Sequence, residues 1–412
     1  MNKLIIQPLV ESSISTVIVI DALDECKDDE PTSAVLSVLG QFVAEIPKVK
    51  FFVTGRPEPR IQTGFRLPLL AEATDVFVLH EVEPSQVNND IRLFFKHNFS
   101  QTRIRQPGLG NWPTEEQVDL LCKRAAGLFV YAVATVRCID QKNKNPERQL
   151  DRLLQSMESK MEGKTKLKTN TTLDSLYMAI LDEAFGEDDP EDYPIVRSVL
   201  GAVILAANPL SPSAIATLLG FDSRDVSSLL SSLHSLLILQ EDTDHPVRPF
   251  HKSFPDFLID PTRCADSRFR VSPLDQHTEI LVGCLELMNR KLEQNMCRLP
   301  DRVVNSEVRD LKERTARYID KALQYACRSW HKHVVEVTTI RTPDITPALR
   351  QFLGGKFVFW LEVLSVLGSA REAVDALETS ARWAAVSCAS LQVHPEDLPG
   401  LDPGVVSPRY HQ

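Results

Sequence analysis

Three acidic residues follow an apolar run near the start of the 412-residue sequence. The run TVIVID ends in Asp21, and Asp24 and Glu25 lie just beyond it. A carboxylate at the tip of a buried strand can hold the Mg²⁺ that bridges two phosphate groups, and a following carboxylate can orient the attacking water. This spacing indicates a phosphate-handling metal site, with Asp21 as the Mg²⁺ ligand and Asp24 and Glu25 as catalytic acids. The alternative is a buried strand that ends in a solvated acidic turn.

A second apolar run, VKFFVT, ends in Gly55 and Arg56. A guanidinium at the tip of the neighbouring strand could contact a terminal phosphate and report its presence. An arginine beside a turn proline is otherwise an ordinary surface residue. The position of Arg56, one strand–helix unit after Asp21, is what makes it a candidate.

Parallel strands are the elements that would bring these residues to one edge. Residues 16–26 run without alternation, which is typical of a strand buried on both faces. A helix over about 33–46 and a strand over 49–54 complete a βαβ unit. A third strand is expected at 75–79. The sequence thus predicts an incomplete parallel sheet of about three strands, followed by helices.

The motif GxxxxGK[ST], whose backbone N–H groups and lysine cradle nucleotide phosphates, does not occur in this sequence. Gly163-Lys164-Thr165 is a partial match, but Glu158 stands where the first glycine belongs and no strand precedes it. Too few residues precede the first strand to supply the cradle. We therefore expect weak or absent nucleotide binding by this chain.

The remainder of the sequence is mainly helical. Thr114 and Gln117 predict a capped helix that breaks at Gly127 and resumes to about residue 139. The segment 142–170 is expected to be partly helix and partly linker. Further helices are predicted at 195–207, 212–219, 225–237, 273–294, 307–330, 347–368 and 370–385.

Three of these helices and a possible two-stranded wing near residues 242–246 suggest a winged helix. His251, in PFHKSFPDFL, follows this wing. On the residues alone, the favoured interpretation is a histidine satisfied within the packing of the wing. The helix over 225–237 contains no Lys or Arg, which argues against a role as a recognition helix that binds in a DNA groove.

Composition excludes several classes of protein. The sequence has 46 Lys and Arg against 56 Asp and Glu, a net charge of −10, so a nonspecific grip on nucleic acid or anionic lipid is not expected. The eight cysteines show no CxxC pair and no zinc spacing, which indicates reduced thiols. No apolar stretch is long enough to span a membrane and no signal peptide is evident. We expect a cytoplasmic protein without nucleic-acid partners or a membrane span.

In this order, the pieces resemble the NACHT-type STAND NTPases of fungi, relatives of the NOD-like receptors that often carry a nephrocystin-3-like N-terminal domain. The resemblance covers about residues 3–385. It rests on LIIQPL (4–9), VIVIDALDEC (17–26, as Walker B), TGRPEP (54–59, as sensor 1), AAGLFVYA (125–132, in the lid), LDSLYMAIL (173–181), PFHKSFPDFL (249–258), YACRSWHKHV (325–334) and FWLEVLSVLG (359–368).

The resemblance implies roles for five residues. Asp21 would hold Mg²⁺, Asp24 and Glu25 would supply acids near the γ-phosphate, and Arg56 would sense that phosphate. His251 would contact the β-phosphate of ADP and lock the resting state, which makes ADP or ATP and Mg²⁺ the implied cofactors. The chain departs from the family in two places, since Walker A is missing and Phe129 stands where relatives often have a nucleotide-contacting proline in the lid.

By the same resemblance the chain divides into 1–99 (partial NACHT subdomain), 100–170 (lid and linker), 171–263 (winged helix), 264–390 (helical domain) and 391–412 (tail). The implied function is a fragment of a signalling switch of the innate-immunity or heterokaryon-incompatibility type. It would act with protein partners or by self-association. Two alternatives stay open: a nucleotide-independent helical scaffold, and a competent ATPase if the chain is part of a longer product.

Overall fold

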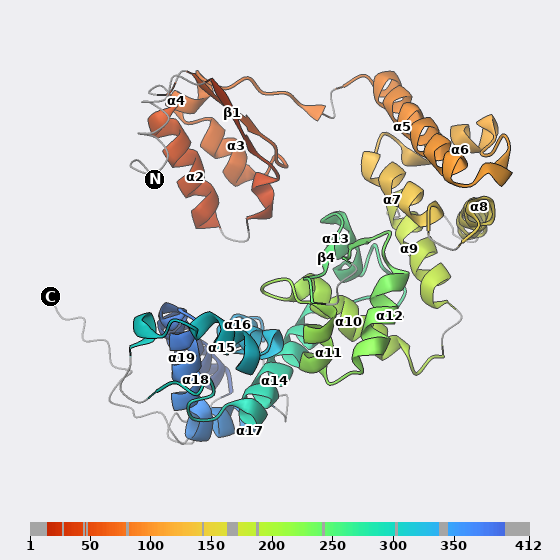
Figure 1. The fold of residues 1–412 in the computed structure, drawn as a ribbon. Helices are drawn as coiled ribbons and strands as arrows, with labels where there is room; N and C mark the ends of the chain where they lie inside the picture. The colour runs from red at the N-terminus through yellow and green to blue at the C-terminus, as the bar shows by residue number, and fades with distance from the viewer. Residues whose placement is uncertain are drawn as a thin grey trace. The chain divides into compact units, whose positions relative to one another are not determined.

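The computed structural model describes residues 15–26, 29–43, 46, 48–79, 82–141, 144–162, 172–186, 189–240, 244–300, 304–337 and 345–391. Two compact units, 1–83 and 84–412, are described separately below (Figure 1). The described residues are mostly helical and form two sheets of two strands each. Three predicted features lie outside them: LIIQPL at 4–9, Gly163–Thr165, and the tail beyond residue 391.

The first unit contains the predicted βαβ arrangement. Strand β1 (Thr16–Ile20) pairs in parallel with β2 (Val49–Val53) in a register that runs from Thr16 opposite Val49 to Ile20 opposite Val53. Helix α2 (Asp29–Phe42) connects them, and α3 (Pro59–Phe65) and α4 (Pro68–Ala71) follow. Because the strands are parallel, their carboxyl ends meet at one edge, where Asp21 and Thr54 follow the two strands.

The expectation that the first strand is buried on both faces is wrong for the described residues. Alternate side chains of β1 and β2 pack with Leu36 of α2 and Ile61 of α3, whereas Val17, Val19 and Phe52 are about 60% exposed (63%, 62% and 60%). An uninterrupted apolar run predicts burial on both faces only if elements cover both. In this unit the described helices pack against one face.

The third predicted strand, residues 75–79, belongs to neither sheet of the described residues. Its apolar side chains Val76, Phe77 and Leu79 are more than three-quarters exposed, at 76%, 77% and 77%. A β-strand is stabilised by the hydrogen bonds and side-chain contacts of a neighbouring strand, and its own composition cannot replace them. The observed parallel sheet therefore has two strands, not about three.

The second unit opens with α5 (Pro84–Arg105), α6 (Glu115–Ala125), α7 (Phe129–Ile139), α8 (Pro146–Glu162) and α9 (Thr172–Phe185). The predicted cap is confirmed: the Thr114 side chain accepts from the Gln117 backbone N–H, and Gln117 accepts in return from that of Thr114. Gly127 has a φ of 80°, a left-handed conformation that interrupts the helix between α6 and α7, as predicted. Helix α5 continues to Arg105, so it crosses the boundary that the sequence predicts after residue 99, between the first two domains.

Next come α10 (Tyr193–Leu205), α11 (Pro212–Leu219), α12 (Ser223–Ser232), the short antiparallel strands β3 (Leu237–Ile238) and β4 (Arg248–Pro249), and α13 (Ser253–Ile259). Helix α12 starts earlier than predicted and so includes Arg224, whose guanidinium binds the capping Asp222. Its exposed face is otherwise rich in serines whose hydroxyls bond back to backbone carbonyls.

The C-terminal helices are α14 (Pro273–Lys291), α15 (Leu311–Tyr318), α16 (Lys321–Val334), α17 (Ile345–Gln351), α18 (Phe357–Val366) and α19 (Ala370–Leu391). The buried rings of Trp330, Phe352 and Trp360 meet edge to face at their centre. Gly283 lets α14 approach α11, since a Cβ there would collide with the carbonyl oxygen of Leu218. In the part of the chain that the structure describes, no helix is both long and apolar enough to cross a membrane.

Candidate functional site

The first part of the candidate site lies where the two parallel strands end. The hydroxyl of Thr54, the residue after β2, donates to Oδ1 of Asp21, the residue after β1. The hydroxyl oxygen of Thr54 in turn accepts a hydrogen bond from the N–H of Ala22 at 2.9 Å. Ala22 has left-handed backbone angles (φ 53°, ψ 52°), which turn the chain sharply into the short 3₁₀ helix Leu23–Glu25. Thr54 thus fixes an exposed strand-end carboxylate from the neighbouring strand.

Asp24 and Arg56 are brought together, as a pair rather than as two independent phosphate contacts. The buried Asp24 carboxylate accepts from the Arg56 backbone N–H at 3.1 Å, and Arg56 Nε lies 3.6 Å from its Oδ2. Arg60 also binds the backbone carbonyls of Asp24 and Cys26, at 3.1 and 3.3 Å. These contacts tie the loop after β2 to the turn after β1, which gives Asp24 a positioning role in the turn.

Carboxylates in this turn do not converge as a preformed cage. Asp21 and Glu25 are exposed and Asp24 is buried. Across the described residues, no group of three or more His, Cys, Asp or Glu side chains is placed to hold a metal ion. Mg²⁺, however, is usually held by one or two carboxylates together with phosphate oxygens and water. A single strand-end carboxylate, Asp21, fits that need, and no contact among the described residues assigns a chemical role to Glu25.

His251 lies in the second unit, between β4 and α13. Its exposed ring is held at Nδ1, which contacts the Ser253 hydroxyl at 2.6 Å and accepts from the Ser253 backbone N–H at 3.1 Å. The Ser253 hydroxyl in turn lies 2.7 Å from the Tyr177 hydroxyl of α9. Burial raises the pKa of Tyr177, so its hydroxyl stays protonated. The arrangement presents an exposed imidazole on a buried support.

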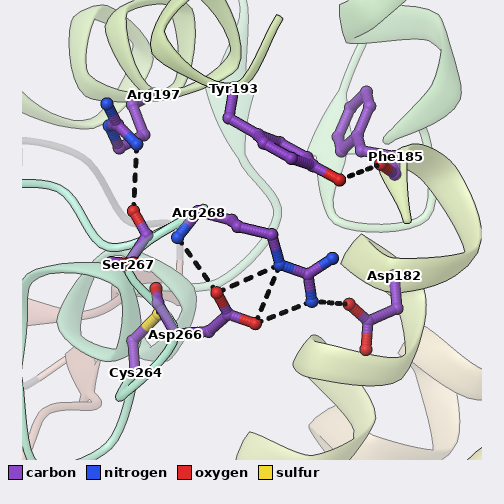
Figure 2. Close-up of polar contacts among 8 residues, drawn as sticks. All are labelled: Asp182, Phe185, Tyr193, Arg197, Cys264, Asp266, Ser267 and Arg268. Atoms are coloured by element: carbon purple, nitrogen blue, oxygen red, sulfur yellow. Dashed lines mark hydrogen bonds and ion pairs between the residues drawn. The ribbon is translucent and has the colours of Figure 1, made fainter. Parts of the chain in front are cut away.

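Helix α9, which carries Tyr177, is held at both ends by arginines of the segment after α13. Near its start, Arg263 donates to the buried Asp174 at 2.6 Å. Near its end, Arg268 bridges Asp182 and Asp266, each at 2.7 Å (Figure 2). The hydrogen bonds that Arg263 donates to Asp174, and those that Arg268 donates to Asp266, raise the pKa values of the two guanidiniums.

Two further contacts complete the bracing seen in Figure 2. Arg197 of α10 donates to the Ser267 carbonyl at 3.0 Å, and the Tyr193 hydroxyl donates to the Phe185 carbonyl at 3.3 Å. The Arg268 guanidinium also lies 4.9 Å from the centre of the Phe269 ring. Helices α9 and α10 and the segment after α13 are therefore connected by charge-assisted bonds.

Arg137 connects α7 to the region of the short β3–β4 hairpin. It donates to the carbonyls of His234 and Leu237 at 2.5 and 2.8 Å, and its guanidinium lies 4.5 Å above the Phe250 ring. Phe129 at the start of α7 is 43% exposed, and its ring meets Phe94 of α5 edge to face at 6.1 Å. Phe129 therefore contributes to the contact between α7 and α5.

Sequence reasoning missed four residues of this site: Thr54, Arg60, Tyr177 and Ser253. Thr54 and Arg60 stand beside the predicted Arg56, in VTGRPEPR, but no motif assigns them a role. Tyr177 and Ser253 lie in LDSLYMAIL and PFHKSFPDFL, both of which carry the family resemblance. Their hydroxyls could be linked to His251 only once the packing of α9 beside α13 was known.

Comparison with known proteins finds similarity both in the N-terminal segment and along most of the chain. Residues 1–56 match the family described as "Nephrocystin 3, N-terminal", and this range contains the acidic turn and ends at Arg56. Over 388 residues the chain is 23% identical to the "Vegetative incompatibility protein HET-E-1" of Podospora anserina, covering 88% of this chain and 26% of that protein. The chain is a distant relative of HET-E-1. It spans about a quarter of that protein's length.

Proposed function

We propose that this chain is part of a nucleotide-dependent signalling switch of the STAND type, as in incompatibility proteins. Its two contributions to the nucleotide are the acidic turn of the first unit and His251 of the second. The observation that carries the proposal is the strand-end carboxylate of Asp21, held by Thr54 within a segment that matches the nephrocystin 3 N-terminal family. The similarity to HET-E-1 supports the signalling context.

Within this proposal, β1 corresponds to the Walker B strand and the segment after β2 to sensor 1. Asp21 would hold the Mg²⁺ of Mg·ATP, and that ion would supply charge neutralisation at the phosphates. Arg56, paired with Asp24, would reach the γ-phosphate from the same edge. Helices α10 to α12 with β3 and β4 would form the winged helix, and His251 would contact the β-phosphate of ADP. A ligand that binds one conformation of the chain more tightly than another shifts the population toward that conformation.

Affinity should be low because the phosphate cradle is missing from the sequence. Each charge-assisted hydrogen bond contributes about 1.5–3 kcal/mol. Three such contacts near the upper end of this range, less an association cost of about 5 kcal/mol, leave about 4 kcal/mol, which corresponds to a dissociation constant of about 1 mM. We accordingly propose binding and switching as the function, with little ATP hydrolysis by this chain.

Titration calorimetry of the full chain with ADP and with Mg·ATP tests this proposal. We expect a dissociation constant of about 1 mM for ADP, weakened about tenfold by His251→Gln, the equivalent of about 1.4 kcal/mol. Asp21→Ala should weaken Mg·ATP by a similar factor and change ADP binding without Mg²⁺ little. Both effects follow from removing one phosphate-side contact each.

Matched controls exist in both units. His97→Gln and Asp75→Ala each remove an exposed side chain of the same type, and neither should change affinity. Micromolar Mg·ATP binding would contradict the proposal that the missing cradle limits affinity. Binding that is indifferent to both Asp21 and His251 would contradict the site itself.

A helical scaffold that acts without nucleotide is the second candidate. It is favoured by apolar side chains of α18 and α19 that are exposed in the described part of the chain: Val358 at 71%, Leu361 at 36%, Val374 at 55% and Leu377 at 42%. Contiguous exposed apolar side chains often mark protein–protein contacts. Capture of a partner that depends on Val358 and Val374 but survives Asp21→Ala would favour this function.

The third hypothesis is a competent ATPase within a longer product. It would gain support from a transcript that joins Met1 in frame to an upstream GxxxxGK[ST] segment.

A further inference from the structure

Residues 75–79 form an apolar segment that is not paired within the described part of the chain. Val76, Phe77 and Leu79 are 76%, 77% and 77% exposed. Residues 74–78 lie in no helix or strand, and no backbone hydrogen bond among the described residues involves them. Valine and phenylalanine favour strands, and adjoining exposed apolar side chains often mark a contact with another molecule. The segment is therefore suited to add to the edge of a sheet.

The outer edge of β2 is the counterpart of this segment. Among the described residues, the first sheet consists of β1 and β2 alone, so each strand has one edge whose backbone groups are not paired in the sheet. Lys50 of β2 is exposed, on the same face as Phe52, whereas β1 carries no charged side chain. A lysine on an edge strand disfavours the addition of a wholly apolar strand. The edge of β2 therefore selects a strand with an acid opposite Lys50.

One register matches the segment to this edge. With Asp75 opposite Lys50 in a parallel pair, Phe77 stands opposite Phe52, and both pairs lie on the exposed face of the sheet. Val76 is then on the other face, where the helices pack. Opposite charges and aromatic rings that face each other across neighbouring strands stabilise the pairing. A shift by one residue puts Asp75 on the helix-covered face, and the antiparallel direction puts Phe77 beyond the start of β2.

A second copy of this chain supplies both missing partners at once. Within one copy, the segment is exposed, and β2 pairs with β1 alone among the described residues. In a pair of copies, the segment of each adds to β2 of the other, which closes the assembly with two-fold symmetry and leaves both segments paired. Strand addition of this kind draws its affinity from backbone hydrogen bonds and its specificity from the facing side chains.

We propose that two copies of this chain associate by exchanging residues 75–79, each segment adding in parallel to the outer edge of β2 in the other copy. The association goes beyond the proposed function and does not depend on it. Asp75 pairs near the amino end of β2, whereas Asp21 and Arg56 follow the carboxyl ends of the two strands. A substitution at Asp75 therefore tests the association without removing a proposed nucleotide contact.

Disulfide cross-linking between two different variants tests the exchange. A Phe52→Cys chain is mixed with a Phe77→Cys chain, both with Cys26→Ser, because Cys26 is the one free cysteine of the described residues that is not buried. Neighbouring strands lie about 4.8 Å apart, a separation that a disulfide can span. Each chain carries one of the two new cysteines, so the expected covalent dimer forms only between copies. Neither variant alone should give it.

Val76→Cys is the matched control for the register. Val76 is as exposed as Phe77 in the single chain, at 76% and 77%, but lies on the opposite face from Phe52 in the paired strand. Mixed with Phe52→Cys, this variant should give about tenfold less covalent dimer, because successive side chains of a strand point to opposite faces.

Sedimentation of chains without added cysteines measures the role of the charged pair. Asp75→Lys should weaken dimer formation about tenfold, equivalent to about 1.4 kcal/mol, because it places like charges opposite each other twice in the dimer. Lys50→Glu combined with Asp75→Lys restores opposite charges and should return the association to its original strength. Thermal unfolding followed by circular dichroism verifies that each variant is folded.

Three results would overturn the exchange. If a chain with both Phe52→Cys and Phe77→Cys closes its disulfide within the monomer, at a yield independent of protein concentration, the segment pairs with β2 of its own chain. Equal cross-linking by Val76→Cys and Phe77→Cys means an apolar contact without a strand register. A chain that stays monomeric and yields no covalent dimer means that the edge of β2 does not bind this segment.

Discussion

Arg263→Met should lower the free energy of unfolding by about 4 kcal/mol, because it leaves the Asp174 carboxylate buried without its cation. Asp174 is 1% exposed and receives bonds from Arg263 at 2.6, 3.2 and 3.3 Å. The methionine keeps most of the apolar stem but offers no donor. Urea unfolding followed by circular dichroism at neutral pH measures the difference.

The doubly apolar variant Asp174→Leu, Arg263→Met is the informative partner of this experiment. Replacing a buried ion pair by apolar side chains is often neutral, so most of the loss should be recovered. Arg268→Met is the matched control: its pairs with Asp182 and Asp266 are more exposed (34% for Arg268, 24% for Asp182 and 26% for Asp266), and the cost should be about 1 kcal/mol for each pair. Equal losses for Arg263→Met and Arg268→Met would contradict the assignment of a buried charge at Asp174.

Acidification from pH 6.5 to 4 should remove about 3 kcal/mol of stability through His331. Burial, helped by Lys332, lowers the pKa of this imidazole from its ordinary value of 6.5 to about 4. Between these two values the unfolded chain binds a proton that the folded chain does not. The contribution of His331 to the free energy of unfolding is therefore fully present above pH 6.5 and is lost as the pH falls toward 4.

The difference in stability between the unmodified chain and His331→Phe, measured across this pH range, isolates the contribution of this residue. The variant should show a shallower decline, by up to about 3 kcal/mol at pH 4. His97→Gln replaces an exposed histidine and should leave the slope unchanged. Parallel declines for the unmodified chain and His331→Phe would mean that His331 is not buried in the neutral form.

Local signals in the sequence predicted local structure well. Thr114, Gln117 and Gly127 gave the boundaries of α6 and α7 because a cap and a left-handed break involve only neighbouring residues. Ser211 likewise caps α11, accepting from the Ala214 N–H at 3.3 Å. The βαβ unit was also predictable, since a crossover helix between two apolar runs enforces parallel pairing.

The predictions that proved wrong concern segments whose structure depends on elements distant in the sequence. Burial of both faces of β1, and a strand at 75–79, each required another element to cover or pair with an apolar segment, and no residue within the segment specifies that element. Helix α5 continues across the predicted domain boundary at residue 99 because Phe99 and Thr102 are buried, and Arg105 binds Asp140 at the end of α7.

The candidate site divides in the same way. The sequence placed Asp21 and Arg56 at adjacent strand ends from topology alone. It did not reveal that Arg56 pairs with Asp24, that Thr54 holds Asp21, or that Tyr177 supports His251. Each of these contacts joins residues at least 32 positions apart, a separation across which hydroxyl and carboxylate side chains leave no sequence pattern.

Hydrogen–deuterium exchange of the full chain with and without ADP is the most direct test that nucleotide binds at the proposed residues. At about 10 mM ADP, ten times the expected dissociation constant, peptides covering residues 21–26 and 54–58 and a peptide covering 249–256 should all exchange more slowly. His251→Gln should reduce the protection of the peptide covering 249–256, and Asp21→Ala should reduce that of the peptide covering 21–26 when Mg·ATP replaces ADP. Protection at none of the three peptides would contradict the proposed function.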